Sequence, residues 1–262
     1  MRDIEPMLIS PQHDIPNKIV ILNPKGGCGK STLATNLAAF YAQQGRTPAI
    51  LDFDPQGSAI AWLKRRPGAL PTIHGIAAYK KSMRATRSWQ LRVPDDTVNV
   101  IVDSPAGISH EQLREITQDT TTILVPVLPS FMDIDTASRC IANLLLVANV
   151  EHNDRRLAVV ANRTRKHTKS LTRLMRFLDT LGIPIIAVLR DSQNFVDSAE
   201  MGIGLHEMQR SQVRPDVEQL EGIARWLDGQ SERRQTAVDA TVIQRRSFSK
   251  VSFLRRRQAD LA

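Results

Sequence analysis

The sequence predicts an α/β fold of a single domain, in which a mainly parallel sheet carries helices on both faces. Three observations support it: short β-branched runs alternate with longer helical patterns, most positions of the runs are apolar, and 42% of the 262 residues are hydrophobic. Strands buried on both faces and followed by helices are typical of parallel sheets. Right-handed crossovers would place all strand carboxyl ends at one edge, where such folds bind ligands.

Six strands and four long helices are expected along the chain. The first strand covers residues 18–22, and the helix after it covers residues 31–44 and ends at Gly45, a common stop signal. Further strands are expected at residues 48–51, 98–102, 122–127, 157–161 and 184–189, and further helices at residues 134–147, 167–181 and 216–227. Residues 18–229 would then form the core domain, between a short extension at 1–17 and a basic tail at 230–262.

Composition argues against several classes of protein. No run reaches 18 apolar residues, so we expect no membrane-spanning helix. Residues 1–17 contain no apolar block, so we expect no secretory signal. The two cysteines, Cys28 and Cys140, are too few for a disulfide framework or a four-cysteine zinc site. We therefore expect a cytoplasmic protein.

The formal net charge of +8 is concentrated in three segments. Residues 64–92 contain eight basic residues and no acid, and residues 163–176 contain six basic residues and no acid. Residues 230–262 contain eight basic and three acidic residues. Such local basicity indicates polyanion-binding surfaces, and solvated helix faces are the alternative for each cluster.

A glycine-rich segment, NPKGGCGKST at residues 23–32, directly follows the first strand. Glycines let backbone N–H groups surround phosphates, Lys30 would supply charge to the β- and γ-phosphates, and the Ser31 hydroxyl is placed for Mg²⁺. The helix that starts there points its positive end at the anion. The candidate nucleotide-binding residues are Lys25, Gly26, Gly27, Cys28, Gly29, Lys30, Ser31 and Thr32.

One departure from the ordinary phosphate loop is informative. The pattern G-x-x-x-x-G-K-[ST] requires glycine at position 24, where this chain has Pro24. Residues 25–31 instead read KGGCGKS, which resembles the deviant loop K-G-G-x-G-K-[ST] of the ParA/MinD ATPases. The resemblance implies that Lys25 reaches across a dimer to the partner's nucleotide and that Lys25 and Lys30 take part in catalysis.

Aspartates end the second and third strands. Carboxylates at strand ends beside a phosphate loop can hold Mg²⁺ or orient an attacking water. Residues 52–57, DFDPQG, resemble the family's switch I, which implies that Asp54 orients the catalytic water and that Asp52 supports the metal. Capping of a helix from Ser58 is the alternative for both. Asp103 follows a strand with four apolar residues, Val98 and residues 100–102, in a Walker B pattern and is expected to hold Mg²⁺.

Later matches to the family are weaker. Residues 126–130, PVLPS, follow the fourth strand as in the ParA branch, and Asp133 and Asp135 are better explained as charges at a helix amino terminus. Asn162 and Arg163 follow the fifth strand, where the resemblance implies an adenine-reading asparagine. A turn residue is the alternative for Asn162. The scattered histidines, including His110 and His206, are expected at the surface.

The resemblance covers residues 18–228 and implies a Mg²⁺-dependent ATPase of the ParA/ParF-like branch. Such a protein dimerises on ATP, binds DNA non-specifically, and positions a plasmid, a chromosome or a protein organelle such as a carboxysome, as McdA-type relatives do. A ParB-like or adaptor partner would stimulate hydrolysis. Non-specific binding through phosphates needs basic patches and no base-reading module. We therefore expect a cytoplasmic, nucleoid-associated homodimer.

Two other functions remain open at this stage. A MinD-like protein would bind membrane through a carboxyl-terminal amphipathic helix, but residues 242–258 segregate their apolar and basic residues only in part. DNA or partner contact and a solvated tail are the other interpretations of this segment. A metabolic phosphate-loop enzyme, such as a dethiobiotin-synthase-like ligase, is less compatible with the basic clusters and with the Asp-Pro-Gln segment at 54–56.

Overall fold

The computed structural model describes residues 16–80, 93–146 and 156–259. Its seven strands form one sheet in the order β3-β2-β4-β1-β5-β6-β7, and every neighbouring pair is parallel. The strands are β1 (Asn17–Ile21), β2 (Thr47–Asp52), β3 (His74–Ala77), β4 (Thr97–Asp103), β5 (Thr122–Val127), β6 (Leu157–Thr164) and β7 (Ile185–Arg190). The prediction of a parallel α/β sheet is confirmed.

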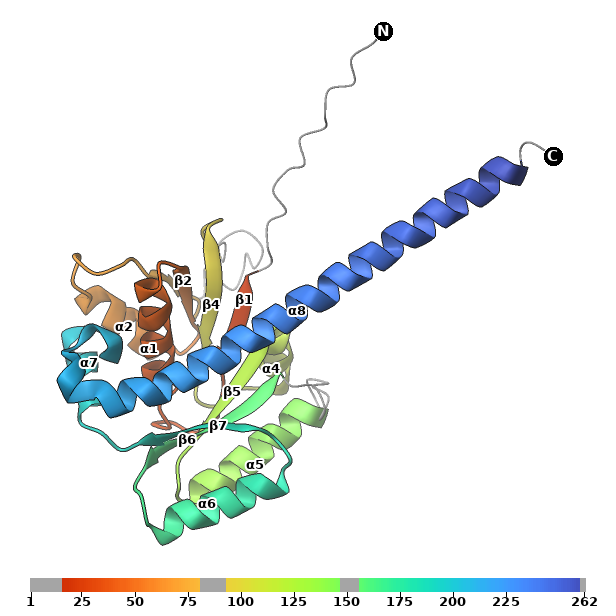
Figure 1. Cartoon of the computed structure of the whole chain (residues 1–262). Helices are drawn as coiled ribbons and strands as arrows, with labels where there is room; N and C mark the ends of the chain where they lie inside the picture. The colour runs from red at the N-terminus through yellow and green to blue at the C-terminus, as the bar shows by residue number, and fades with distance from the viewer. Residues whose placement is uncertain (1–15, 81–92, 147–155, 260–262) are drawn as a thin grey trace.

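Helices cover both faces of the sheet (Figure 1). On one face lie α1 (Lys30–Gln43), α2 (Ser58–Arg65), α7 (Asn194–Met201) and the first part of α8 (Arg210–Ala259). On the other lie α4 (His110–Thr117), α5 (Phe131–Leu146) and α6 (Lys169–Thr180). A short 3₁₀ helix, η1 (Leu205–Glu207), connects α7 to α8.

Side chains of β1 point alternately into the two hydrophobic cores, one on each face of the sheet. Ile19 and Ile21 are fully buried in the core under α1 and α8, whereas Val20 and Leu22 are fully buried in the core under α4, α5 and α6. Successive side chains of a strand point to opposite faces. A strand covered on both faces is therefore apolar on both sides, which is why residues 19–22 form a continuous apolar run.

The six expected strands are all present, and the structure adds a seventh. The additional strand is β3, a four-residue strand at the edge of the sheet. Three of its residues are partly buried, and Gly75 is exposed. Helices α4 and α7, of eight residues each, were also not expected. The helix expected from residue 167 begins instead at Lys169, because the Thr168 hydroxyl caps it by accepting from the Leu171 N–H at 3.3 Å.

The last helix is much longer than expected. The helix expected over 216–227 is present, but its bounds are wrong, since α8 runs for 50 residues from Arg210 to Ala259. A glycine in a helix interior costs only about 1 kcal/mol, so Gly229 alone does not end a helix. Figure 1 shows α8 crossing the sheet and extending well beyond it. The proposed boundary between core and tail at 229/230 therefore falls within one helix.

Two expectations fall partly on residues that the structure does not describe. Most of the short extension at 1–17 and residues 81–92 of the first basic cluster lie outside the described residues. Within the described ranges, no helix is long and apolar enough to cross a membrane.

Candidate nucleotide-binding site

The loop between β1 and α1 lies at the carboxyl edge of the sheet. Gly27 and Gly29 have φ values of +75° and +96°, in the left-handed region that glycine adopts without strain. Gly29 is also the residue that precedes the first turn of α1. The buried Lys30 folds back over the loop, and its Nζ donates to the Lys25 carbonyl at 3.1 Å. The loop thus surrounds a point near an ammonium group and a helix amino terminus, as a phosphate site requires.

Asn162, at the end of β6, contacts this loop. Its Nδ2 donates to the Cys28 carbonyl at 2.8 Å, and its Oδ1 accepts from the Arg163 N–H at 2.9 Å. A Cβ on Gly29 would lie 2.3 Å from this Nδ2 atom, so the approach requires glycine. Asn162 therefore holds the loop. The adenine-reading role that the resemblance implies stays a prediction.

Asp52, at the end of β2, organises the start of α2. It is fully buried, and its Oδ2 accepts from the Ala59 and Ile60 N–H groups, each at 3.1 Å. Its Oδ1 accepts from the Asp54 N–H at 3.0 Å. These bonds match the capping role that was the alternative for Asp52. Its support of a metal ion stays a prediction.

Asp54 lies in the turn between β2 and α2. Its backbone carbonyl accepts from the Gly57 N–H at 2.8 Å, and its Oδ1 accepts from the Gln56 N–H at 3.0 Å. The turn is thus built by local bonds, and the side chain of Asp54 is only half-buried. A carboxylate held beside the loop but still reached by water suits the orientation of a water molecule.

Asp103, at the end of β4, is the group best suited to a metal ion. It is fully buried, and among the described residues neither carboxylate oxygen has a hydrogen-bond partner. Burial raises the pKa of Asp103 to about 7, against the opposing effects of the Ser31 hydroxyl and the Lys30 charge. A buried, unpaired carboxyl beside a serine hydroxyl and a phosphate loop matches the oxygen donors that Mg²⁺ prefers.

Few protein side chains are available to complete the coordination of such an ion. The described part of the chain holds no group of three or more His, Cys, Asp and Glu residues arranged for a metal. Magnesium is commonly held by one or two protein oxygens together with water and nucleotide phosphates, so this finding is compatible with the site. Ser31 and Asp103 are the residues that fit Mg²⁺ here.

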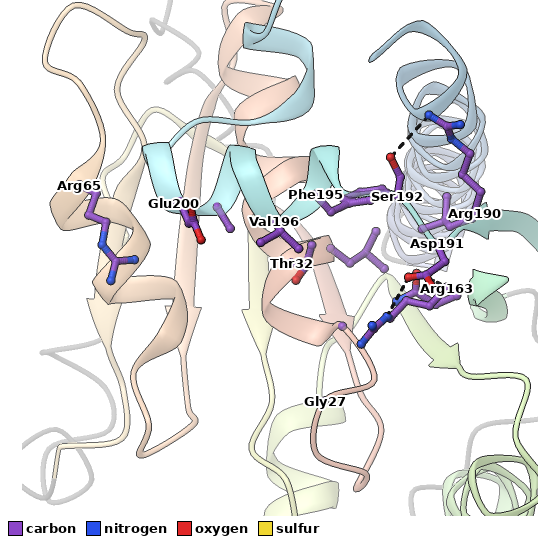
Figure 2. A pocket seen from close by; sticks show the side chains of 15 residues that line it. Gly27, Thr32, Arg65, Arg163, Arg190, Asp191, Ser192, Phe195, Val196 and Glu200 are labelled. Atoms are coloured by element: carbon purple, nitrogen blue, oxygen red, sulfur yellow. Dashed lines mark hydrogen bonds and ion pairs between the residues drawn. The ribbon is translucent and has the colours of Figure 1, made fainter. Parts of the chain in front are cut away.

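A cavity of about 530 Å³ opens beside the loop (Figure 2). Gly27, Gly29 and Thr32 form one part of its wall. Apolar, polar and charged residues from α1, α2, α7 and the ends of β6 and β7 complete the lining: Leu33, Arg65, Asn162, Arg163, Leu189, Arg190, Asp191, Ser192, Phe195, Val196, Ala199 and Glu200. A largely apolar cavity beside a phosphate loop fits a nucleoside.

Asp191, directly after β7, forms ion pairs with two arginines at the end of β6. Its carboxylate pairs with Arg163 Nε at 3.3 Å and with Arg165 Nη2 at 3.1 Å, and Figure 2 shows Arg163 and Asp191 facing each other. The bonds from Arg165 and Arg163 lower the pKa of Asp191. Sequence reasoning did not select Asp191, although its position directly after a strand is the signal that identified the other site residues. Nothing in the sequence pattern marked Phe195.

Three residues considered in the sequence analysis, Cys28, Asp133 and Asp135, have structural roles. Cys28 is fully buried, and burial raises the pKa of its thiol, which suits a small space-filling residue. Asp133 and Asp135 lie in the first turns of α5, where the Asp133 N–H donates to the Ser130 hydroxyl and Asp135 pairs with Arg139 at 3.0 Å. Both aspartates are helix charges, as expected.

Comparison with known proteins agrees with this geometry. A family described as the CobQ/CobB/MinD/ParA nucleotide binding domain matches residues 19–205, most of the chain. The chain belongs to this family. As a ParA/MinD-family protein it therefore shares a nucleotide-binding domain whose matched range includes the phosphate loop, Asp54, Asp103 and Asn162.

Similar proteins include two named "Maintenance of carboxysome distribution protein A". The one from Halothiobacillus neapolitanus is 27% identical over 172 residues, which cover 64% of this chain and 76% of the relative. The one from Gloeobacter kilaueensis is 32% identical over 145 residues, which cover 55% of this chain and 64%, slightly under two thirds, of the relative. The septum site-determining protein MinD of Thermotoga maritima is 25% identical over 237 residues.

Solved structures of the ParA/MinD family share the fold. Nucleotide-free McdA of Cyanothece has a TM-score of 0.66 at 16% identity and covers 81% of this chain and all of its own. The MinC:MinD cell division complex of Aquifex aeolicus has a TM-score of 0.59 at 20% identity, covering 81% of this chain and 96% of its own. At these identities the likeness concerns the fold alone.

Proposed function

We propose that this protein is a Mg²⁺-dependent ATPase of ParA type, which dimerises on ATP and positions a cargo on DNA. The observation that carries the proposal is the arrangement at the carboxyl edge of the sheet. The ammonium of Lys30 lies over the glycine loop, and the buried, unpaired carboxylate of Asp103 lies beside Ser31. Ser31 and Asp103 would hold Mg²⁺, which would supply positive charge to offset the negative charge on the phosphates during hydrolysis.

Three residues would take part in ATP hydrolysis. Lys30 would bind the β- and γ-phosphates, and Asp54, held at the end of the turn before α2, would orient the attacking water. Lys25 would complete the site of a second copy. The backbone of Lys25 is fixed at both ends, because its N–H donates to Asn23 Oδ1 at 2.9 Å and its carbonyl accepts from Lys30. Among the described residues its side chain makes no hydrogen bond or ion pair, which leaves it available for the partner.

A basic surface on and before α6 is the proposed DNA contact. Lys166, Lys169, Arg173 and Arg176 are exposed, and no ion pair to them is found among the described residues. Lys169, Arg173 and Arg176 recur at intervals of four and three residues, so they share one helix face. Arg163 and Arg165 from the same cluster are engaged by Asp191. A dimer would double this basic surface, so ATP would control DNA affinity.

The cargo and partner are inferred from relatives. Two relatives bear names that refer to carboxysome distribution, and others are named chromosome-partitioning ATPase Soj and protein ParA. We infer that this protein likewise distributes or partitions a cargo, with an adaptor or ParB-like protein that stimulates hydrolysis. This activity places the protein on the nucleoid.

A MinD-like function at membranes is the second candidate. It is favoured by the alignment with Thermotoga maritima MinD, which extends over 78% of this chain. Under that function the distal part of α8, within the basic segment 230–262, would contact anionic lipid. Co-sedimentation with vesicles of anionic phospholipid, with ATP and with ADP, distinguishes it. ATP-dependent binding to vesicles, without ATP-dependent binding to DNA, would replace the DNA function by this one.

Fluorescence anisotropy with a random-sequence DNA duplex tests the main proposal. We expect binding with Mg²⁺ and ATP but not with ADP, and a steep fall in affinity between low and physiological salt, because phosphate contacts release counterions. Joint substitution of Arg173→Ala and Arg176→Ala should weaken binding by about tenfold. Arg139→Ala, which removes an exposed arginine paired with Asp135 on α5, is the matched control. Equal binding without nucleotide would overturn ATP control.

A further inference from the structure

Asp216, near the start of α8, is a buried carboxylate that the site described above does not use. Its side chain is completely buried. It accepts hydrogen bonds from Arg190 through both Nε and Nη2, the latter at 2.8 Å. It also accepts from the Ser192 hydroxyl at 3.0 Å and from Asn194 Nδ2 at 2.7 Å. One carboxylate of α8 thus binds three side chains of the segment that joins β7 to α7.

Two more contacts attach the same segment to α8. The Arg190 N–H donates to Gln219 Oε1 at 3.1 Å, and Asn194 Nδ2 also donates to the Gln212 carbonyl at 3.3 Å. Gln212, Asp216 and Gln219 thus accept hydrogen bonds from both ends of the segment at 190–194. Helix α8 therefore holds both ends of this segment, Arg190 through its backbone N–H and side chain and Asn194 through its side chain.

The segment held in this way is a wall of the cavity. Arg190, Asp191 and Ser192 line the pocket, and the first residues of α7 that follow, Phe195 and Val196, line it as well. Figure 2 shows Ser192 and Arg190 linked beside Phe195, with the coils of α8 behind them. Asp216 lies behind the wall and does not line the pocket.

The charge of Asp216 strengthens this arrangement. Burial by itself would raise its pKa, but the bonds from Arg190, Asn194 and Ser192 outweigh burial and lower it. A buried carboxylate with all its donors in place favours one arrangement of those donors, because leaving it unpaired costs far more than at the surface. A neutral residue of the same shape would hold Arg190 much less firmly.

We propose that Asp216 is a positioning residue of the nucleotide pocket, acting through Arg190, Ser192 and Asn194 to fix the wall that receives the nucleoside. The inference rests on the proposed function, since it assumes that the cavity beside the phosphate loop binds ATP. It assigns to α8, which contributes no residue to the cavity lining, a role in nucleotide affinity. Asp216 acts on binding and leaves the phosphate loop, Asp54 and Asp103 unchanged.

Steady-state ATPase kinetics and binding of a fluorescent ATP analogue to the full chain test the inference. Asp216→Asn should raise KM and Kd by about tenfold and change kcat by less than about twofold, since bonds to a charged group are replaced by weaker neutral ones. Glu218→Gln, which alters an exposed acid of the same helix paired with Arg214 at 2.8 Å, is the control and should leave both constants unchanged.

A second variant separates positioning from general destabilisation. Asn194→Ala removes one donor to Asp216 from outside the pocket lining and should raise Kd by about threefold. If both residues act through one network, the double variant should lose less affinity than the product of the two single effects. A lower unfolding temperature with unchanged Kd in both single variants would overturn the inference. Absence of ATP binding by the unmodified chain would instead overturn the proposed function.

Discussion

The side-chain amide of Asn162 donates to the Cys28 carbonyl at 2.8 Å, which ties the end of β6 to the middle of the phosphate loop. The contact joins residues 134 positions apart in the chain. It is accommodated because Gly29, at φ +96°, has no Cβ to obstruct the amide. The loop is therefore held in shape before any nucleotide binds, and preorganisation of this kind increases affinity by reducing the cost of ordering.

Substitution Asn162→Ala should weaken nucleotide binding by about tenfold, the cost of one lost hydrogen bond together with the unsatisfied Cys28 carbonyl. Because the amide holds the loop, we expect ATP and GTP to lose affinity by similar factors. Isothermal titration with both nucleotides measures this. A loss confined to ATP would contradict loop holding as the main role and would favour adenine recognition.

Lys30→Ala should abolish measurable ATP binding and hydrolysis, because Lys30 is the buried cation nearest the loop carbonyls. The control is Lys64→Ala, which removes an exposed lysine from the last turn of α2. Equilibrium dialysis with labelled ATP and phosphate release give the two readouts. Retained ATP affinity in the Lys30 variant would contradict the position assigned to the phosphates.

Asp54→Ala should separate binding from hydrolysis. The carboxylate is expected to orient water, so its loss should lower kcat by at least about 100-fold and leave ATP affinity within about threefold. Gln56→Ala, which changes the exposed neighbour whose N–H donates to Asp54, is the control. Normal turnover by the Asp54 variant would transfer the catalytic role to another residue.

The ion pair between Arg66 and Glu207 should contribute to the stability of the fold and not to ATP binding. Their side chains, 6% and 0% exposed, form a bidentate ion pair with bonds of 2.8 and 2.6 Å between the end of α2 and η1. Glu207→Gln leaves a buried arginine without its counter-charge and should lower the free energy of unfolding by about 3 kcal/mol. Urea denaturation measures the loss. The KM for ATP should not change, and a large change in KM would contradict a structural role.

Burial of the His206 ring should make the free energy of unfolding depend on pH. It was expected at the surface, but both ring nitrogens are buried without a partner among the described residues, and the ring packs on Phe40 with centroids 4.8 Å apart. Burial lowers its pKa below the ordinary 6.5. The unfolded chain then binds this proton more readily than the folded one, so stability should fall as pH drops below about 6.5.

The His206→Gln variant should show a flatter dependence of unfolding free energy between pH 7.5 and 5.5, about the range over which an ordinary histidine titrates. Urea denaturation at several pH values measures the slope. The exposed His110→Gln serves as the control and should keep the steeper dependence. An identical slope in the unmodified chain and the His206 variant would contradict the burial argument.

The parts of the site that the sequence predicts are those built from contiguous residues. The loop at 23–32 and the aspartates at 52, 54 and 103 stand directly after strands, and parallel topology brings strand ends to one edge. Asp191 obeys the same rule after β7 but lacks a recognisable motif. Asp216 obeys no local rule, because its role depends on a contact with Arg190 that only the packed fold creates.

The differences in the fold have equally specific causes. Edge strand β3 spans four residues and includes Gly75, where a Cβ would lie 2.4 Å from the Leu63 side chain, so packing rather than an apolar pattern determines the residue. Helix α4 carries a signal that went unused, since Ser109 and Gln112 form a capping box. The continuation of α8 past Gly229 follows from the low cost of one glycine in a long helix.

Sedimentation velocity of the Asp54→Ala variant tests the central claim most directly, because this variant should bind ATP without consuming it. With Mg²⁺ and ATP it should sediment as a dimer, and with ADP or without nucleotide as a monomer. Adding Lys25→Ala should restore the monomer in the presence of ATP, since the proposed role of Lys25 is to reach the partner's nucleotide. A monomer of the Asp54 variant at saturating ATP, or a dimer that persists without Lys25, would contradict the account.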